Sequence, residues 1–223
     1  VTGGAVPAVR DGARGRRLAD LPRPDDDLEA GRPLRAGERA ARPGAVAAGR
    51  VESDVVPRQH PKSRFDVHTP MAVASVRGTR FGVSAAPDAA TSEVTQGQVV
   101  VRSLLSRRTS ATLVAGQGAR VSAEGALQRG DLLPAADLSA LPTQWDDGEF
   151  VPFALPKQAQ AQAYRLRVLQ ADTPGAVLRE AWVKDPAVLW QALDDGSYTL
   201  AVQGLDTLGL LGQTAEHSFR VLA

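Results

Sequence analysis

The side chains best suited to chemistry in this sequence are three runs of carboxylates. They are Asp25-Asp26-Asp27, Asp146-Asp147 and Asp194-Asp195. A calcium loop needs oxygen ligands at alternating positions, closed by a distal bidentate carboxylate, and none of the three runs has that spacing. We therefore interpret all three as solvated turns and assign no metal ligand to them.

The serines and carboxylates of the chain form no recognised catalytic motif. Ser106, Ser110 and Ser139 have no histidine near them in the sequence, although the members of a triad can be distant along a chain. A glycosidase carboxylate pair is likewise set by the fold and stays open. No G-x-S-x-G, phosphate-loop or H-E-x-x-H segment occurs. We expect no catalytic residue, no cofactor and no enzymatic activity.

The composition argues against several further classes of protein. The 223 residues include no cysteine and three histidines, and the net charge is +1. Disulfides, thiol catalysis and thiolate metal sites are therefore excluded, and a dedicated histidine metal site is disfavoured. A balanced charge offers no basic surface for nucleic acid. No apolar run reaches the roughly 18–20 residues of a membrane helix, so no membrane span is expected.

The chain divides into a polar first segment and two segments typical of β structure. Residues 1–50 are rich in Ala, Arg, Gly, Pro and Asp and contain no aromatic residue. Such a composition buries too little apolar surface to offset the entropy of ordering. We expect a low-complexity, largely disordered segment over residues 1–50, a β domain over 51–133, a linker over 134–142 and a second β domain over 143–223.

Short runs of alternating apolar residues, separated by glycines, predict antiparallel strands in both β segments. In the first segment the turn signals are Gln96-Gly97 and Gly116-Gln117-Gly118. In the second segment, six or seven short strands and the turn signal at Gly196 predict a small immunoglobulin- or fibronectin type III-like β-sandwich. Four aromatic residues are its predicted core anchors, with carbohydrate stacking as the alternative role: Tyr164, Trp182, Trp190 and Tyr198.

The most specific pattern lies within residues 64–102. The run from Thr69 to Phe81 reads T-P-M-A-V-A-S-V-R-G-T-R-F, and the run from Glu93 to Val101 reads E-V-T-Q-G-Q-V-V-V. This resembles the FecR domain family, whose core reads T-P-x-A-V-A-x-V-R-G-T-x-F and continues into an E-V-x-x-G-x-V-x-V strand pair. The second β segment resembles the immunoglobulin-like tail of one FecR subgroup, whose members usually carry a signal peptide and an N-terminal, peptidoglycan-binding LysM domain.

We expect structural roles for the residues that carry this motif. Gly78 would permit a positive φ at a sharp corner, Arg77 would cap exposed carbonyls, and Gly97 would form a turn. A partner contact at Arg77-Gly78-Thr79 is the alternative. The motif positions are Thr69, Pro70, Val73, Val76, Arg77, Gly78, Thr79, Phe81, Glu93, Gly97 and Val99.

The resemblance implies a non-catalytic protein of the periplasm or cell envelope of a Gram-negative bacterium. Its expected role is that of a binding, scaffold or sensor module, with an envelope protein or peptidoglycan as partner. The best-known members of the family are anti-sigma regulators in iron-siderophore surface signalling, and this is the alternative function. No signal peptide, membrane helix or sigma-binding domain of that kind is recognisable in the sequence.

Overall fold

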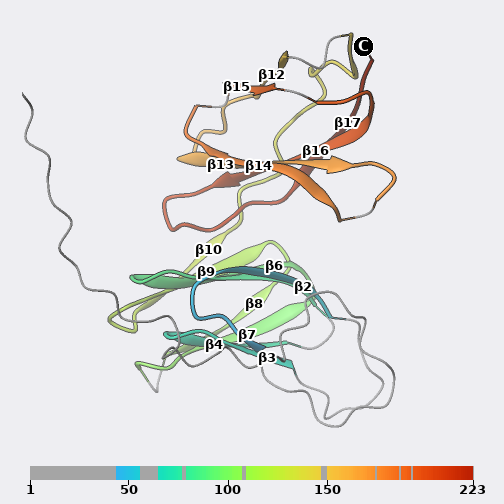
Figure 1. The fold of residues 1–223 in the computed structure, drawn as a ribbon. Helices are drawn as coiled ribbons and strands as arrows, with labels where there is room; N and C mark the ends of the chain where they lie inside the picture. Colours follow the sequence, from blue (N-terminus) through green and yellow to red (C-terminus); the bar gives the residue numbers. More distant parts are fainter. Residues whose placement is uncertain are drawn as a thin grey trace, which may run out of the picture. The chain divides into compact units, whose positions relative to one another are not determined.

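The computed structural model describes residues 44–55, 65–76, 79–106, 109–146, 150–173, 175–185, 187–191 and 193–222. Every regular element in these ranges is a β-strand (Figure 1), which confirms the predicted mostly β fold. None of the described segments is a helix long and apolar enough to cross a membrane. The disorder expected for residues 1–43 concerns a part of the chain outside the described residues.

Strands β1 to β10 build two five-stranded sheets, which we together call the first sandwich. Sheet A has the order β1-β3-β4-β7-β8 and sheet B the order β10-β9-β6-β5-β2. Neighbouring strands are antiparallel except for β1 and β3, which are parallel. The bounds are β1 Gly44–Ala45, β2 Gly49–Asp54, β3 Phe65–His68, β4 Ala72–Val76, β5 Arg80–Ala85, β6 Ala89–Gln96, β7 Gln98–Ser103, β8 Ser110–Val114, β9 Gln117–Ser122 and β10 Leu127–Asp131.

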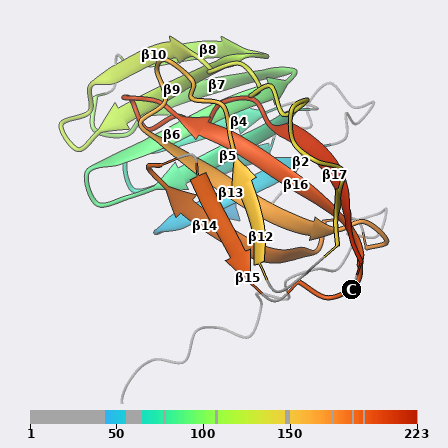
Figure 2. The same cartoon turned by 90° about the horizontal axis from the view of Figure 1, so that it is seen from above.

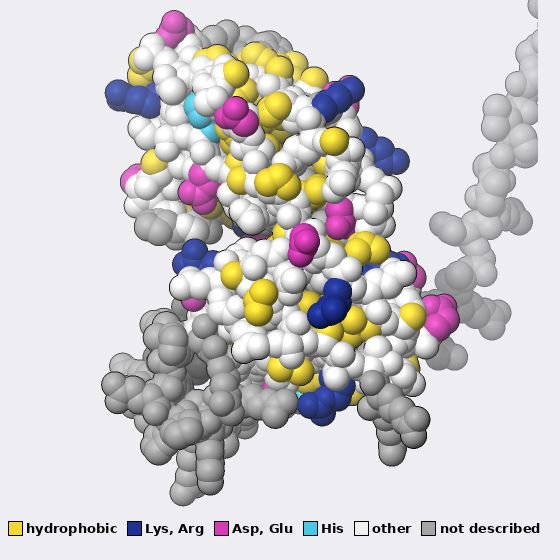
Figure 3. All heavy atoms as spheres, turned by 180° about the vertical axis from the view of Figure 1, so that it is seen from behind, with side chains coloured by type: hydrophobic (Ala, Val, Ile, Leu, Met, Phe, Trp, Pro, Cys, Tyr) yellow, Lys and Arg dark blue, Asp and Glu magenta, His cyan; other side chains and the backbone are white. Residues whose placement is uncertain are grey.

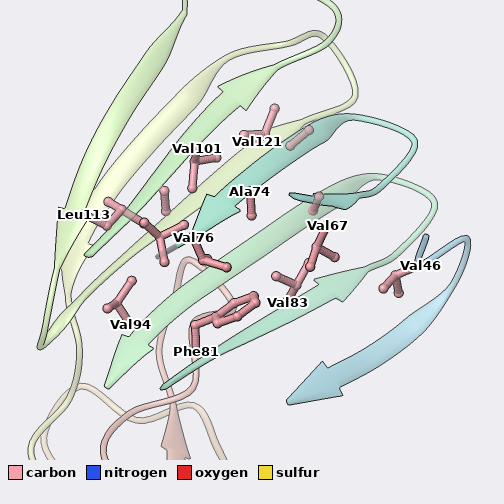
Figure 4. Packing of buried hydrophobic residues seen from close by; sticks show 14 of the residues in the cluster. Val46, Val67, Ala74, Val76, Phe81, Val83, Val94, Val101, Leu113 and Val121 are labelled. Atoms are coloured by element: carbon pink, nitrogen blue, oxygen red, sulfur yellow. The ribbon is translucent and has the colours of Figure 1, made fainter. Parts of the chain in front are cut away.

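The core of the first sandwich lies between these two sheets, as Figure 4 shows for the labelled side chains. Sheet A contributes Val76 and Val101, and sheet B contributes Phe81 and Val94, all of them buried. Side chains alternate between the two faces of a strand, so Phe81 reaches the core while Gly82 lies on the outer face of sheet B. The apolar residues that alternate along these strands therefore lie on the inner faces of both sheets.

Strands β11 to β17 form the second sandwich, with five-stranded sheet C in the order β11-β17-β16-β13-β14 and sheet D made of β12 and β15. Figures 1 and 2 show the β12–β15 pair lying across one face of sheet C. Phe153 and Phe219 pack between them, with ring centroids 5.3 Å apart. The bounds are β11 Gln144–Trp145, β12 Phe150–Ala154, β13 Ala163–Gln170, β14 Val177–Val183, β15 Ala187–Gln191, β16 Gly196–Leu205 and β17 Ala215–Val221.

Three of the four predicted aromatic anchors are buried in the second sandwich, and one is not. Tyr164, Trp190 and Tyr198 are buried, whereas the side chain of Trp182 is 52% exposed. The prediction for Trp182 was wrong because alternation shows which residues share a face of a strand, but not which face is covered. On β14 it is Ala181 that packs against the core.

Residues 44–50, expected within the disordered segment, contribute β1 and the start of β2. Val46 is buried in the core of the first sandwich, and its amide donates a hydrogen bond to the carbonyl of His68. The strand β2 was missed because Arg50 and Glu52 give it no apolar alternation. Both charged side chains have partners that only the folded structure brings near.

Candidate functional site

The candidate site lies on the outer face of sheet B, where four residues form one row across four strands. Glu52 of β2 is opposite Gly82 of β5, Gly82 is opposite Glu93 of β6, and Glu93 is opposite Gly118 of β9. The row thus alternates two glutamates with two glycines. Residues directly opposite each other on one face lie close enough for their side chains to interact.

Glu93, the glutamate of the FecR-like motif, is buried although it points away from the core of its own sandwich. Its side chain is 2% exposed. Oε2 accepts a hydrogen bond from Arg50 Nη1 at 2.9 Å, and Oε1 accepts one from Thr91 Oγ1 at 3.1 Å. Oε1 also accepts a hydrogen bond from the backbone N–H of Leu211, at 3.3 Å, and this residue belongs to the second sandwich.

The protonation of Glu93 is governed by opposing effects. Burial raises the pKa of this carboxyl. The nearby Arg50 and the hydrogen bonds from Leu211 and Thr91 lower it, but the pKa stays above its ordinary value. An ionised carboxylate at this depth depends on its partners, because an unpaired charge in a protein interior is strongly disfavoured. The Arg50 guanidinium, which also bonds Ser84 Oγ at 3.0 Å, is therefore essential to the ionised state.

The two glycines of the row make room for these contacts. A Cβ at Gly82 would clash with Nη2 of Arg50 and lie 3.0 Å from Oε2 of Glu93. A Cβ at Gly118 would lie 2.9 Å from Cδ1 of Leu210 and 3.1 Å from a backbone oxygen of its own sheet. Gly82 thus lets the arginine reach the buried carboxylate, and Gly118 lets a leucine of the second sandwich sit against the sheet.

Glu52, at the exposed end of the row, binds three arginines from both sandwiches. Arg50 of its own strand lies 3.1 Å from Oε1, and Arg165 and Arg167 of β13 bond Oε1 and Oε2 respectively. Partial burial raises the pKa of Glu52, but Arg167, Arg50 and Arg165 outweigh it and lower the pKa from 4.5 to about 2. We call Arg50, Glu52, Glu93, Arg165 and Arg167 the inter-sandwich network.

The turn between β16 and β17, residues 206–213, completes the contact, and we call it the coupling loop. Leu210 within it is 1% exposed. Oδ1 of Asp206 accepts hydrogen bonds from the amides of Leu208 at 2.9 Å and Leu210 at 2.8 Å, which fixes the shape of the loop. Arg120 of β9 donates to the carbonyl of Leu208 at 3.4 Å. The loop therefore binds the first sandwich through both backbone and side chains.

This arrangement holds two sandwiches together and offers no catalytic geometry that we recognise. Both glutamates of the row are committed to arginines. Within the described ranges, no group of three or more His, Asp or Glu residues could hold a metal ion. Asp194 and Asp195 lie exposed in a turn, whereas Asp147 and Asp25 to Asp27 lie outside the described residues. The chemistry of the site is that of a buried, charge-paired interface.

The other motif residues lie within the first sandwich and shape its strands. Thr69 closes the turn into β4: its hydroxyl donates to the carbonyl of Ala72 at 3.0 Å and accepts from the amide of the same residue at 2.9 Å. Thr79, 1% exposed, donates to the carbonyl of Gln98 at 3.0 Å. Gly97 adopts a φ of 85° in the turn between β6 and β7.

The remaining motif positions are divided between the core and the surface. Val76, Phe81 and Val99 are buried, Val73 is half-buried and Pro70 is exposed. Arg77 and Gly78 lie outside the described residues, so the predicted corner and the alternative partner contact there stay predictions.

Glu93 was predicted as a motif residue, but its role in the contact between the sandwiches was not predicted. One signal was present in the sequence. Glu93 stands in a strand whose other face is apolar, and Gly82 stands in the preceding strand at a position where the alternating pattern would allow a larger residue. Arg165 and Arg167 carried no signal of their own, because they reach Glu52 only across the boundary between the sandwiches, and Arg50 reaches Glu93 only across strands.

Part of the chain is similar to a known protein family and to solved structures. Residues 35–100 match the family described as FecR protein. No curated protein matches the chain. Among solved structures it is similar to a candidate anti-sigma factor from Parabacteroides distasonis, at 20% identity over 42% of this chain and 44% of that one, with a TM-score of 0.36. It is also similar to fibronectin(III)-like modules of Clostridium thermocellum CbhA, at 11% identity over 82% of this chain and 90% of that one, with a TM-score of 0.31.

The family match and the motif fall on the same strands. The chain spans less than half the length of the P. distasonis protein. The matched range contains the motif from Thr69 to Val99, including the buried Glu93. The match to the FecR family is limited to residues 35–100.

Proposed function

We propose that this chain is a non-catalytic sensor or scaffold module of the bacterial cell envelope, in which the FecR domain and the second sandwich act as one unit. The observation that supports this most directly is the position of Glu93. This motif glutamate accepts hydrogen bonds from Arg50 of its own sheet and from Leu211 of the second sandwich. A partner that binds one sandwich would therefore act on a body that includes the other.

The surface of the described residues suits binding better than catalysis. Its exposed large apolar side chains include Leu105, Trp182 and Leu189. In the face seen in Figure 3, hydrophobic side chains gather on the part that contains β11 to β17, and charged side chains of both signs are scattered around them. Grouped apolar side chains on a soluble surface are typical of a site for another macromolecule.

We expect the partner to be an envelope protein or peptidoglycan, bound through strand edges and loops. The test incubates the purified chain with insoluble peptidoglycan and, separately, with detergent-solubilised outer-membrane proteins. Saturable retention by peptidoglycan supports the proposal, and an unrelated β-sandwich protein of similar net charge serves as the control. Absence of retention, together with capture of one outer-membrane receptor, would overturn it.

The alternative function is an anti-sigma regulator in iron-siderophore surface signalling, and the FecR family match favours it. Deletion of the gene would then change the transcription of iron-transport genes when a siderophore is supplied. Unchanged transcription, with the protein found in the envelope fraction, would exclude this alternative and leave the scaffold or sensor role.

A further inference from the structure

Strand β2 lies at the edge of sheet B and contributes almost nothing to the hydrophobic core. Within the described part of the chain it pairs with β5 alone. None of its six residues is buried, and its one large apolar side chain, Val51, is 40% exposed. In contrast, β5 and β6 each contain several buried residues. A strand with few buried apolar contacts and an exposed backbone opens at a lower free energy than the core strands do.

The residues that flank β2 are held more firmly than the strand itself. Before the strand, Val46 is buried in the core of the first sandwich, where Figure 4 labels it. After the strand, Val55 packs against the same core, and its amide donates a hydrogen bond to the carbonyl of Thr79 at 3.0 Å. Residues 46–55 therefore form a short segment with apolar ends and a polar centre, which we call the strap.

The polar centre of the strap carries the charged groups on which the contact between the sandwiches depends. Arg50 donates a hydrogen bond to the buried Glu93 at 2.9 Å. Two ion pairs link the sandwiches within the described residues, one from Arg165 and one from Arg167, and both end on Glu52. Separation of β2 from β5 would therefore break all three contacts at once.

The coupling loop also depends on the strap, although it does not touch it directly. The amide of Leu211 donates a hydrogen bond to Glu93 at 3.3 Å. If β2 separates from β5, Glu93 loses the arginine that pairs with it, and an unpaired carboxylate is strongly disfavoured there unless water reaches it. Water that reaches Glu93 competes with the amide of Leu211 for the same oxygen. Opening of β2 and loosening of the coupling loop are therefore linked.

We propose that the strap is a conformational switch. With β2 paired to β5 the two sandwiches move as one body, and with β2 separated from β5 the second sandwich is released from the first. This inference rests on the proposed function, in which both sandwiches act as one unit, and adds how that unit is regulated. A partner that binds the first sandwich better when β2 is separated shifts the population towards the released state by that difference in affinity.

A reversible disulfide between β2 and β5 provides the test. The chain has no cysteine, and Asp54 of β2 lies opposite Arg80 of β5, with both side chains exposed. Because the amide of Val55 bonds the carbonyl of Thr79, the adjacent pair is one without mutual hydrogen bonds, in which opposite side chains are closest. The variant that combines Asp54→Cys with Arg80→Cys can therefore be compared in its reduced and oxidised forms.

The measurement is hydrogen exchange of single amides, followed by NMR on the full chain. In the wild type and in the reduced variant, the amides of β2 and of Leu211 are expected to exchange faster than those of β6. Both should also share one weak dependence on urea, because the opening exposes little surface. Oxidation is expected to slow the β2 amides and the Leu211 amide together by about 5–150-fold, the usual range for coupled sites.

The matched control places a disulfide at the edge of the other sheet of the first sandwich. Arg102 of β7 lies opposite Ser110 of β8, and both are exposed. The amide of Ser103 bonds the carbonyl of Thr109, so this pair has the same geometry as the pair between β2 and β5. Oxidation of the variant that combines Arg102→Cys with Ser110→Cys should leave the exchange of the Leu211 amide unchanged.

Two results would overturn the proposal. In the first, the β2 amides exchange only as slowly as those of β6 and with the same urea dependence, which would make β2 a fixed part of the sheet. In the second, the disulfide between positions 54 and 80 slows β2 but leaves Leu211 unchanged. Either result is compatible with the proposed function if the two sandwiches still unfold in one transition. Separate unfolding transitions in the wild type would instead contradict the single unit itself.

Discussion

Replacing Arg50 with methionine should expose how strongly the buried glutamate depends on its arginine. Methionine retains much of the apolar stem of arginine but cannot donate hydrogen bonds to Glu93 or Ser84. Glu93 is 2% exposed and Arg50 16%, so water cannot readily replace the lost partner. The variant therefore leaves a carboxylate in an interface between two sandwiches with only Thr91 and the amide of Leu211 to stabilise it.

The expected cost follows from that burial. Breaking a buried ion pair by removing one partner typically costs about 3–5 kcal/mol, and we expect about 3 kcal/mol at pH 7 because Glu93 can escape part of the cost by taking up a proton. Burial already raises the pKa of Glu93 above its unfolded value. The ionised form is thus the disfavoured one, so the cost of Arg50→Met should grow as the pH rises above about 4.5 and shrink as it falls towards that value.

A second substitution separates the charge effect from the loss of packing. Glu93→Gln should cost about 1 kcal/mol alone, because the amide oxygen can still accept hydrogen bonds. Combined with Arg50→Met, it should recover about 2 kcal/mol, since no buried charge is left unpaired. The assay is urea unfolding of the full chain at pH 7 and pH 5, and Arg80→Met, which breaks an exposed ion pair with Asp54, is the control that should change little. An Arg50→Met cost equal to that of the control, or no recovery in the double variant, would refute the reasoning.

Three further predictions use the same interface. Gly82→Ala places a methyl group in steric clash with the guanidinium of Arg50, and should cost roughly 1–3 kcal/mol in the wild type but little in the Arg50→Met background, by urea unfolding. The pKa of Glu52, lowered to about 2, supports a stability that is complete above about pH 4.5 and lost as the pH falls towards 2. Because Glu52 is 39% exposed, screening limits this effect to about 1 kcal/mol, and Glu52→Gln should flatten acid unfolding curves over that range. Gly118→Val should displace Leu210 and speed hydrogen exchange in residues 206–213, and unchanged exchange there would contradict the packing described.

The strands were predictable because their signals are local. Alternation in Phe81 and Val83, and in Val99 and Val101, identifies side chains that share a buried face. The turn at Gly97 follows from a residue that adopts positive φ without strain. The FecR-like pattern adds a specific family assignment because it fixes residue types over several consecutive strands.

The site was not predictable because it depends on pairings far apart in the chain. Glu93 meets Arg50 only through the order β2-β5-β6, and it meets Leu211 only after the second sandwich has docked. Trp182 illustrates the same limit: its alternation with Ala181 is visible in the sequence, but sheet order decides that β14 is an edge strand. Sequence spacing cannot supply strand order.

Unfolding followed by two probes tests most directly whether the two sandwiches form one unit. All three tryptophans, Trp145, Trp182 and Trp190, belong to the second sandwich, so their fluorescence reports that sandwich alone, while circular dichroism reports both. In the wild type the two transitions should coincide, and in Arg50→Met they should separate. Separate transitions in the wild type, unchanged by Arg50→Met, would contradict the coupling through Glu93.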